Sequence, residues 1–170
     1  IMGIGAVCHT LNPRLFKEQL EYIVNHADDR VILVDLDLVP LIQRSRHALP
    51  GVAHVIVMTD AAHMPAGMPD ALCYETLLTQ SDPDYTWGGF DERTAAGLCY
   101  TSGTTGDPKG VLYSHRSNFL HSYMCQNPDV LGVGESDVVL PIVPMFHANA
   151  WTLAFTAPAV GAKLVMPGPR

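Results

Sequence analysis

Three short apolar runs, separated by segments of helical periodicity, constrain the fold of this chain most. The runs lie at 6–11, 31–34 and 52–58. The middle run, Val-Ile-Leu-Val, is continuous and mostly β-branched, which is typical of a strand buried on both faces. Between the runs, apolar residues recur every three or four positions, which predicts helices over 16–27 and 37–47. This order predicts an α/β fold, with mostly parallel sheets and helices on both faces.

The second half of the chain differs in character from the first. Residues 80–94 are acidic and rich in Pro and Gly, as surface linkers are. We therefore expect a first α/β segment over 1–79, a linker loop over 80–94, and a third segment over 95–170. In the third segment we expect strands at 95–100, 111–113, 138–143 and 164–166, with helices over 117–125 and 148–160.

The composition argues against several classes of protein. Hydrophobic residues make up 48% of the chain and charged residues 16%, which is enough apolar material for a core and argues against disorder. With 10 Lys and Arg against 17 Asp and Glu, the net charge is −7, so we expect no nucleic-acid partner. No apolar run reaches the roughly 18 residues of a membrane-spanning helix, so none is expected.

The cysteines and histidines do not form a recognisable metal or redox motif. Cys8, Cys73, Cys99 and Cys125 contain no C-x-x-C pair. We interpret them as reduced thiols, mostly buried, in a cytoplasmic protein. None of the eight histidines has another four positions away, the spacing of a helical zinc site.

Both ends of the chain lie close to predicted structure. Ile1 opens an apolar stretch, and Arg170 follows a predicted strand and a Pro-Gly-Pro sequence. Natural domain boundaries are usually polar and flexible. We therefore expect this chain to be a piece of a longer one.

An eleven-residue loop, 100–110, carries the most specific chemical signal. Its sequence is Tyr-Thr-Ser-Gly-Thr-Thr-Gly-Asp-Pro-Lys-Gly. Its glycines allow close approach of a ligand, its hydroxyls and backbone N–H groups can donate to phosphate oxygens, and Lys109 adds positive charge. It is not a Walker A loop, because Pro108 precedes the lysine and Gly110 follows it. The alternative interpretation is a flexible surface turn.

Two further stretches complete a resemblance to a known family. Residues 144–151 are Pro-Met-Phe-His-Ala-Asn-Ala-Trp, and residues 5–14 are Gly-Ala-Val-Cys-His-Thr-Leu-Asn-Pro-Arg. Together with the loop, they resemble the adenylate-forming superfamily of acyl-CoA synthetases, firefly-type luciferases and peptide-synthetase adenylation domains. The His-x-Asn-x-Trp pattern is most similar to the medium- and long-chain fatty acyl-CoA synthetases. The resemblance implies a fragment of the large N-terminal domain of such an enzyme.

The resemblance also implies roles for individual residues. The ATP phosphates would be held by Thr101, Ser102, Gly103, Thr104, Thr105, Gly106, Asp107, Pro108 and Lys109. The Thr101 hydroxyl would contribute to Mg²⁺. His147 would be catalytic, and with Ala148 would lie near the α-phosphate and the acyl carboxylate. Trp151 would be a gate between the ATP site and the acyl tunnel.

Each of these roles has a purely structural alternative. Trp151 could belong to the core, because a helix that begins near Ala148 must bury one face. His147 could cap that helix. His115 also fits the family pattern, but we expect Ser114 or His115 only to shape the start of the next helix, so neither is assigned to the site.

The function that the resemblance implies is ATP-dependent acyl-CoA ligation by the full-length protein. A fatty or short-chain carboxylic acid, ATP and CoA would give acyl-CoA, AMP and pyrophosphate through an acyl-adenylate. Residues 1–170 alone are expected to be inactive, because the family's other Mg²⁺ carboxylate, its ribose-binding Asp and its C-terminal Lys are absent.

Several alternatives remain open at this point. The protein could be a luciferase-like enzyme or a peptide-synthetase adenylation domain. It could also be a ligase of the methylmercaptopropionate-CoA type, or a non-catalytic nucleotide-binding module. The resemblance is compatible with a homodimer. The other partners that it implies are small molecules, namely the carboxylic acid, ATP and CoA.

Overall fold

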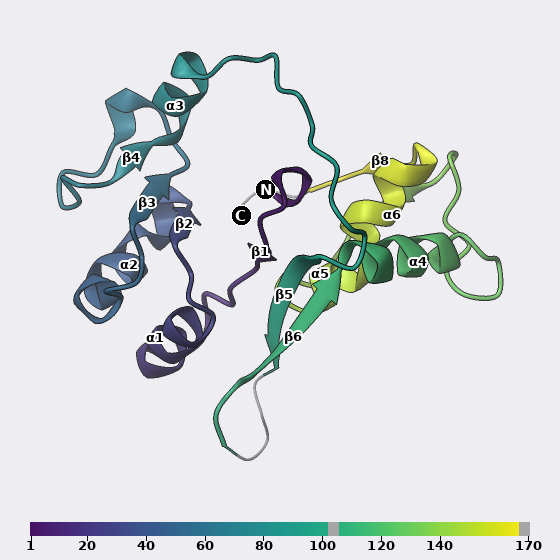
Figure 1. The fold of residues 1–170 in the computed structure, drawn as a ribbon, viewed down its shortest axis with the longest axis horizontal. Coiled ribbons are helices and arrows are strands. Elements are labelled where there is room, and N and C mark those ends of the chain that lie inside the picture. The colour runs from purple at the N-terminus through teal and green to yellow at the C-terminus, as the bar shows by residue number, and fades with distance from the viewer. Residues whose placement is uncertain (102–105, 167–170) are drawn as a thin grey trace. The chain divides into compact units, whose positions relative to one another are not determined.

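The structure is a computed structural model that describes residues 1–101 and 106–166. The chain packs into two compact units (Figure 1). One unit is Asn12–Thr86, and the other combines Ile1–Leu11 with Trp87–Arg170.

The unit Asn12–Thr86 is built on a parallel sheet with strand order β2-β3-β4. Its elements are α1 (Lys17–His26), β2 (Val31–Val34), α2 (Val39–Ser45), β3 (His54–Val57), β4 (Leu72–Cys73) and α3 (Tyr74–Gln80). Single 3-10 turns span Leu36–Leu38, Arg46–Ala48 and Ala61–His63. The parallel β-α-β order confirms the α/β prediction for this part of the chain.

Helix α1 supplies much of the core of this unit. Leu20, Ile23 and Val24 are spaced so that they share one face of the helix, and all three are buried. The polar face carries an ion pair in which Lys17 Nζ lies 3.2 Å from Glu21 Oε1. The buried residues of α1 thus follow the three-to-four-residue periodicity of the sequence.

Strand β2 differs from its prediction in one respect. Its residues alternate between buried and exposed, so it is not covered on both faces within the described residues. Val31 and Leu33 keep 44% and 40% of their surface exposed, whereas Ile32 and Val34 are buried. A continuous apolar run shows that both faces can be buried, but not which elements cover them.

The described residues of the second unit form two small sheets and three helical elements. Its elements are β1 (Cys8–His9), β5 (Ala95–Thr101), β6 (Lys109–Ser114), α4 (His115–Cys125), β7 (Val138–Val139), α5 (Ala148–Trp151), α6 (Leu153–Val160) and β8 (Lys163–Leu164), after a 3-10 turn at Met2–Ile4. The first sheet has the order β1-β5-β6, with β1 parallel and β6 antiparallel to β5. The second sheet pairs β7 and β8 in parallel.

Pairing of β1 with β5 places the first eleven residues in this unit. Cys8 lies opposite Gly97, and His9 lies opposite Leu98. This grouping divides the chain differently from the segments 1–79, 80–94 and 95–170 expected from the sequence. As functional segments, those three remain a prediction.

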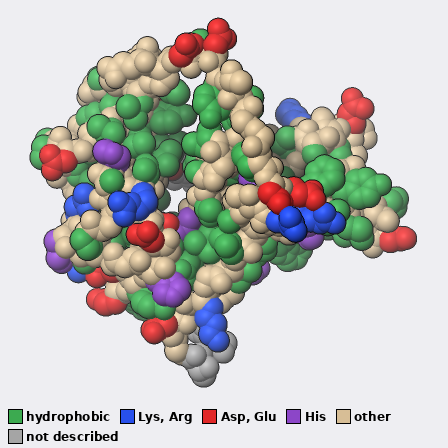
Figure 2. Space-filling view, in the orientation of Figure 1, with side chains coloured by type: hydrophobic (Ala, Val, Ile, Leu, Met, Phe, Trp, Pro, Cys, Tyr) green, Lys and Arg blue, Asp and Glu red, His purple; other side chains and the backbone are tan. Residues whose placement is uncertain are grey.

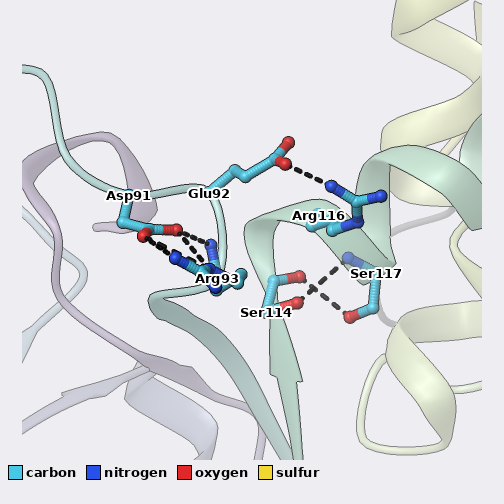
Figure 3. A network of polar contacts seen from close by, with 6 residues as sticks. All are labelled: Asp91, Glu92, Arg93, Ser114, Arg116 and Ser117. Carbon is cyan, nitrogen blue, oxygen red and sulfur yellow. Dashed lines mark hydrogen bonds and ion pairs between the residues drawn. The ribbon is translucent and has the colours of Figure 1, made fainter.

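The start of α4 is fastened to the segment that leads into β5. The backbone N–H of Arg116 donates to the Glu92 carbonyl at 2.7 Å, and the Arg116 guanidinium forms an ion pair with the Glu92 carboxylate. Next to it, hydrogen bonds from Arg93 lower the pKa of the Asp91 carboxyl (Figure 3). In Figure 2, acidic and basic side chains lie side by side over this segment. These contacts fix one end of the β5–β6 hairpin.

Ser114 caps α4, and it is one of the two residues, Ser114 and His115, that the sequence predicted to shape this helix start. Its side-chain oxygen accepts from the Ser117 backbone N–H at 3.1 Å, and the Ser117 hydroxyl donates back to the Ser114 carbonyl at 2.9 Å (Figure 3). The helix begins at His115, two residues earlier than the predicted 117.

We expect Ser114→Ala to lower the free energy of unfolding of the full-length protein by about 1 kcal/mol, because a helix N–H loses its acceptor. Chemical denaturation would measure the loss, and Ser114→Asp, which keeps an acceptor, should recover most of it. Equal stability of the alanine variant and the wild type would show that the cap contributes nothing.

A small apolar core joins α6 to the second sheet. Val133, Ala157 and Ala162 are buried there, packed against Val139, Leu153, Val160 and Leu164. Helix α6 ends at Gly161, whose φ of 79° is a left-handed conformation that suits glycine. Within 1–101 and 106–166, no helix combines the length and the apolar character needed to cross a membrane.

Candidate functional site

The β5–β6 hairpin presents two of the predicted phosphate-binding residues at one end. Thr101 is the last residue of β5 and Lys109 the first of β6, and the two lie directly opposite each other. The Thr101 hydroxyl donates to the Lys109 carbonyl at 3.4 Å, and both residues are exposed. The connection runs through 102–108. Ser102, Gly103, Thr104 and Thr105 lie outside the described residues.

The glycines next to this connection have specific structural reasons. Gly106 has a φ of 102°, which L side chains rarely adopt, and its missing side chain faces open space. Gly110 lies opposite Tyr100, and a Cβ there would come within 3.1 Å of the Tyr100 ring. Between them, Asp107 is exposed and Pro108 is buried. Gly106 therefore suits the backbone of the return into β6, and Gly110 leaves room for the Tyr100 ring.

The second predicted motif ends in a left-handed turn. Residues 148–152 all have positive φ, from 46° at Ala148 to 59° at Thr152. The Thr152 N–H closes the turn by donating to the Ala148 carbonyl at 3.3 Å. We call residues 148–152 the left-handed turn.

The single helix predicted over 148–160 is therefore wrong in its first five residues. The right-handed helix α6 begins only at Leu153. A left-handed helical conformation costs roughly 1–2 kcal/mol for each L-residue. Only Asn149 belongs to a residue type that tolerates it well, so little in the sequence indicates this turn.

The left-handed turn separates an exposed pair of residues from a buried set. Asn149, Ala150 and Thr152 are buried, whereas His147 and Trp151 are exposed, Trp151 to 50%. Within the described residues Trp151 therefore does not belong to the core. His147 precedes α5, but its side chain makes no capping hydrogen bond there. The roles of His147, Ala148 and Trp151 in catalysis and binding remain predictions.

Strand β5 connects the turn to the hairpin end. The Cys99 thiol donates to Asn149 Oδ1 at 3.5 Å, and a Cβ on Gly97 would lie 3.1 Å from Asn149 Nδ2. Successive side chains of a strand point to opposite faces, so residues 97, 99 and 101 share one face of β5. Thr101 and its cross-strand partner Lys109 are therefore on the face that packs against the left-handed turn.

The two predicted motifs thus share one face of one sheet. Thr101 lies two residues, or about 7 Å, beyond Cys99 along β5. Within the described part of the chain, no hydrogen bond joins Thr101 or Lys109 to His147 or Trp151.

Strand β1 also supports the segment before the turn. The Thr10 hydroxyl, just after β1, donates to the Met145 carbonyl at 2.9 Å and lies 3.5 Å from the Cys99 sulfur. Sequence reasoning gave Thr10 and Cys99 no role at the site. Their contribution depends on pairing between segments about 90 residues apart, for which no local signal exists.

The cysteines are free thiols. Burial raises the pKa of the Cys8 thiol, which keeps it protonated and makes it a poor nucleophile. Cys99 and Cys125 are buried and lie against polar atoms of the left-handed turn, Asn149 Oδ1 and Thr152 Oγ1.

The predicted Mg²⁺ ligand, Thr101, lies among the described residues. These residues contain no group of three or more His, Cys, Asp or Glu side chains that could hold an ion. Mg²⁺ in nucleotide enzymes is commonly held by one or two carboxylates together with substrate phosphates, and in P-loop enzymes also by a Ser or Thr hydroxyl. The exposed hydroxyl of Thr101 is a hard oxygen at the end of β5, so it fits a role as one such ligand.

Comparison with known proteins by sequence pattern, by sequence identity and by fold indicates one enzyme family. The sequence pattern of the AMP-binding enzyme family matches residues 1–170. The chain is 51% identical to a medium-chain-fatty-acid–CoA ligase of Ectopseudomonas oleovorans, over 99% of this chain and 31% of the relative. It is 50% identical to a 3-methylmercaptopropionyl-CoA ligase of Ruegeria lacuscaerulensis, over 98% of this chain and 31% of the relative.

The fold is similar to that of a solved adenylate-bound enzyme. The crystal structure of an anthranilate CoA ligase in complex with anthranoyl-AMP matches with a TM-score of 0.84 and 28% identity, covering 97% of this chain and 31% of that one. The chain therefore spans about a third of the length of the relatives it matches. Because the family pattern covers the whole chain, and the two motifs that carry the resemblance lie on one face of the β1-β5-β6 sheet, this chain belongs to the AMP-binding enzyme family.

Proposed function

We propose that the full-length protein is an ATP-dependent acyl-CoA ligase. It joins a carboxylic acid to CoA through an acyl-adenylate and releases AMP and pyrophosphate. The observation that supports this most is the shared sheet face of the Thr101–Lys109 hairpin end and the left-handed turn. Two relatives that are about half identical to this chain are named as CoA ligases.

The proposed chemistry takes place in two steps. A carboxylate oxygen of the acid attacks the α-phosphorus of ATP, and the bond to pyrophosphate breaks. The CoA thiol then attacks the acyl carbonyl carbon, and AMP leaves with the electron pair of the broken bond. Neither step requires a covalent bond to the protein, so positioning and stabilisation of charge supply the catalysis.

Each predicted residue has a definite task in this scheme. The ammonium of Lys109 and the N–H groups and hydroxyls of 101–107 bind the phosphates, which carry negative charge throughout. The imidazole of His147 donates a hydrogen bond to the α-phosphate or the acyl carboxylate. Thr101 would supply one oxygen to Mg²⁺, which would neutralise phosphate charge when bound. Trp151 separates the phosphate region from the acyl tunnel, and Ala148 leaves space beside the carboxylate.

The acid itself is either a fatty acid or a short sulfur-containing acid. Two relatives with almost equal identity to this chain are named for a medium-chain fatty acid and for 3-methylmercaptopropionate. A luciferase-like enzyme or a peptide-synthetase adenylation domain would share the loop, and a non-catalytic module would bind nucleotide without turnover.

ATP–pyrophosphate exchange by the full-length protein separates these alternatives. The panel would contain straight-chain acids from acetate to palmitate, 3-methylmercaptopropionate, anthranilate and several amino acids. We expect exchange with one group of straight-chain or thioether acids, followed by CoA thioester formation. Exchange with amino acids alone would indicate an adenylation domain of peptide synthesis. ATP binding without exchange for any acid would rule out the ligase.

The resemblance also supports proposals about the metal, the location and the oligomeric state of the enzyme. We propose that Mg²⁺ accompanies ATP, that the protein is cytoplasmic, and that it can form a homodimer. The four free thiols support a reducing compartment.

The gate role of Trp151 can be separated from a core role with one variant. In the full-length protein we expect Trp151→Ala to shift the preference between short and long acids by about 10- to 200-fold, the range for small differences in an apolar pocket. Its effect on the melting temperature should be small, because the ring is half exposed in this chain. An exchange series over chain length and a thermal melt would measure both.

The matched control for this variant is Trp151→Phe, which keeps an aromatic wall and should retain most of the original preference. The core role predicts the reverse pattern. Buried aromatic truncations cost about 3–5 kcal/mol, so a large stability loss with unchanged preference would remove Trp151 from the gate.

A further inference from the structure

The hydroxyl of Thr152 lies at the centre of a small polar network at the end of the left-handed turn. It lies 2.7 Å from His121 Nδ1 on α4, and it donates to the Trp151 carbonyl at 2.7 Å. The Cys125 sulfur, one helical turn after His121, lies 3.8 Å from the same oxygen. Thr152 is buried, at 6% exposed.

The single hydrogen of the Thr152 hydroxyl determines the direction of each hydrogen bond in this network. A threonine hydroxyl has one hydrogen and two acceptor sites. Since the hydrogen goes to the Trp151 carbonyl, His121 must donate from Nδ1, and Cys125 can donate only weakly. The single hydroxyl therefore links α4 to the carbonyl of the exposed Trp151.

The conformation of the turn explains why such a link is needed. Thr152 is β-branched and has a φ of 59°, a combination that is a true outlier. Strained residues of this kind persist only where their surroundings over-determine them, and they concentrate at functional sites. At the other side of the turn, the buried Asn149 accepts from Cys99. The turn is thus attached to β5 through Asn149 and to α4 through Thr152.

We propose that His121 and Thr152 are positioning residues. They act through the left-handed turn by fixing the directions in which His147 and Trp151 point. The catalytic part of this inference rests on the proposed ligase function. The structural part, that the His121–Thr152 bond stabilises the turn, stands by itself.

The test uses four variants of the full-length protein. Thr152→Val keeps the shape and the β-branch but removes the hydroxyl, and Thr152→Ser keeps the hydroxyl. His121→Phe removes the donor from α4. Ser122→Ala is the matched control, because it removes a neighbouring buried hydroxyl that has no hydrogen-bond partner among the described residues.

Two measurements are made on each variant. Hydrogen–deuterium exchange of a peptide covering 145–156 reports the turn amides, including the Thr152 N–H that bonds to the Ala148 carbonyl. ATP–pyrophosphate exchange gives kcat and KM for ATP. For Thr152→Val and His121→Phe, we expect amide exchange about tenfold faster and kcat about tenfold lower, the equivalent of ~1.4 kcal/mol. KM for ATP should change less than twofold, while Thr152→Ser and Ser122→Ala should resemble the wild type.

Each outcome decides one part of the proposal. Unchanged amide exchange in Thr152→Val and His121→Phe would show that their bond does not stabilise the turn. Faster amide exchange with an unchanged kcat would show that the turn is stabilised but positions nothing catalytic. If the wild type catalyses no exchange with any acid, the ligase function fails, and the amide measurement alone decides whether the pair stabilises the turn.

Discussion

Replacing Lys109 with alanine in the full-length protein should lower the rate of ATP–pyrophosphate exchange by about 30- to 1,000-fold. Lys109 begins β6 and is exposed, opposite Thr101 at the end of the hairpin. Loss of one charge-assisted phosphate contact in a dry site costs on the order of 2–4 kcal/mol, which corresponds to this range of rates. The same substitution should leave stability within ~0.5 kcal/mol, because the side chain is exposed. We expect Thr104→Ala, which lies outside the described residues, to act in the same direction.

Lys163→Ala is the matched control for this variant. Lys163 is also an exposed lysine at the start of a strand of the same unit, but its strand β8 belongs to the other sheet. Its loss should change exchange by less than about twofold, since remote surface charges contribute little. Near-normal exchange by both Lys109→Ala and Thr104→Ala would show that the loop is structural, and the central proposal would fail.

Truncation of Leu20 to alanine should destabilise the full-length protein by about 3–5 kcal/mol. Leu20 is 2% exposed on the inner face of α1, where Ile23 and Val24 are also buried. Removing a buried leucine side chain loses its transfer free energy and leaves a cavity, which together cost about 2.7–5 kcal/mol. Urea denaturation followed by circular dichroism would measure the shift of the midpoint.

Glu18→Ala tests whether the loss of stability in Leu20→Ala comes from lost burial and not from any substitution in helix α1. Glu18 is exposed in the first turn of the same helix, where its charge favours the helix dipole by only a few tenths of a kcal/mol. We expect a loss below ~0.5 kcal/mol. A Leu20→Ala loss equally small would mean that α1 does not supply the core of its unit.

Two elements of the unit Asn12–Thr86 follow closely from its sequence. The apolar run 31–34 is strand β2 with the same bounds, and the helix predicted over 16–27 is α1 at Lys17–His26. Both depend on a local pattern, a continuous β-branched run or a period of three to four residues. The start of α4, in the second unit, also depends on a local contact, because the Ser114 side chain accepts a hydrogen bond from a residue only three positions away.

The chemistry of the site was also indicated by sequence, but only as motifs. The loop 100–110 and the stretch 144–151 predicted the family, which the whole-chain match confirms. The sequence did not show that the two motifs meet on one sheet. That depends on strand β5, whose alternating residues carry Thr101 toward the hairpin end and Cys99 toward Asn149.

The left-handed turn marks the limit of what the sequence determined. Local rules favour a right-handed helix over 148–160, and a right-handed helix does form from Leu153 onward. In residues 148–152, contacts with distant parts of the chain prevail: Cys99 lies 50 positions before Asn149, and His121 lies 31 before Thr152. The sequence thus determined α1, β2 and the family. The tertiary structure determined the backbone direction beside His147 and Trp151, because burial and long-range hydrogen bonds must offset the local cost of a left-handed turn.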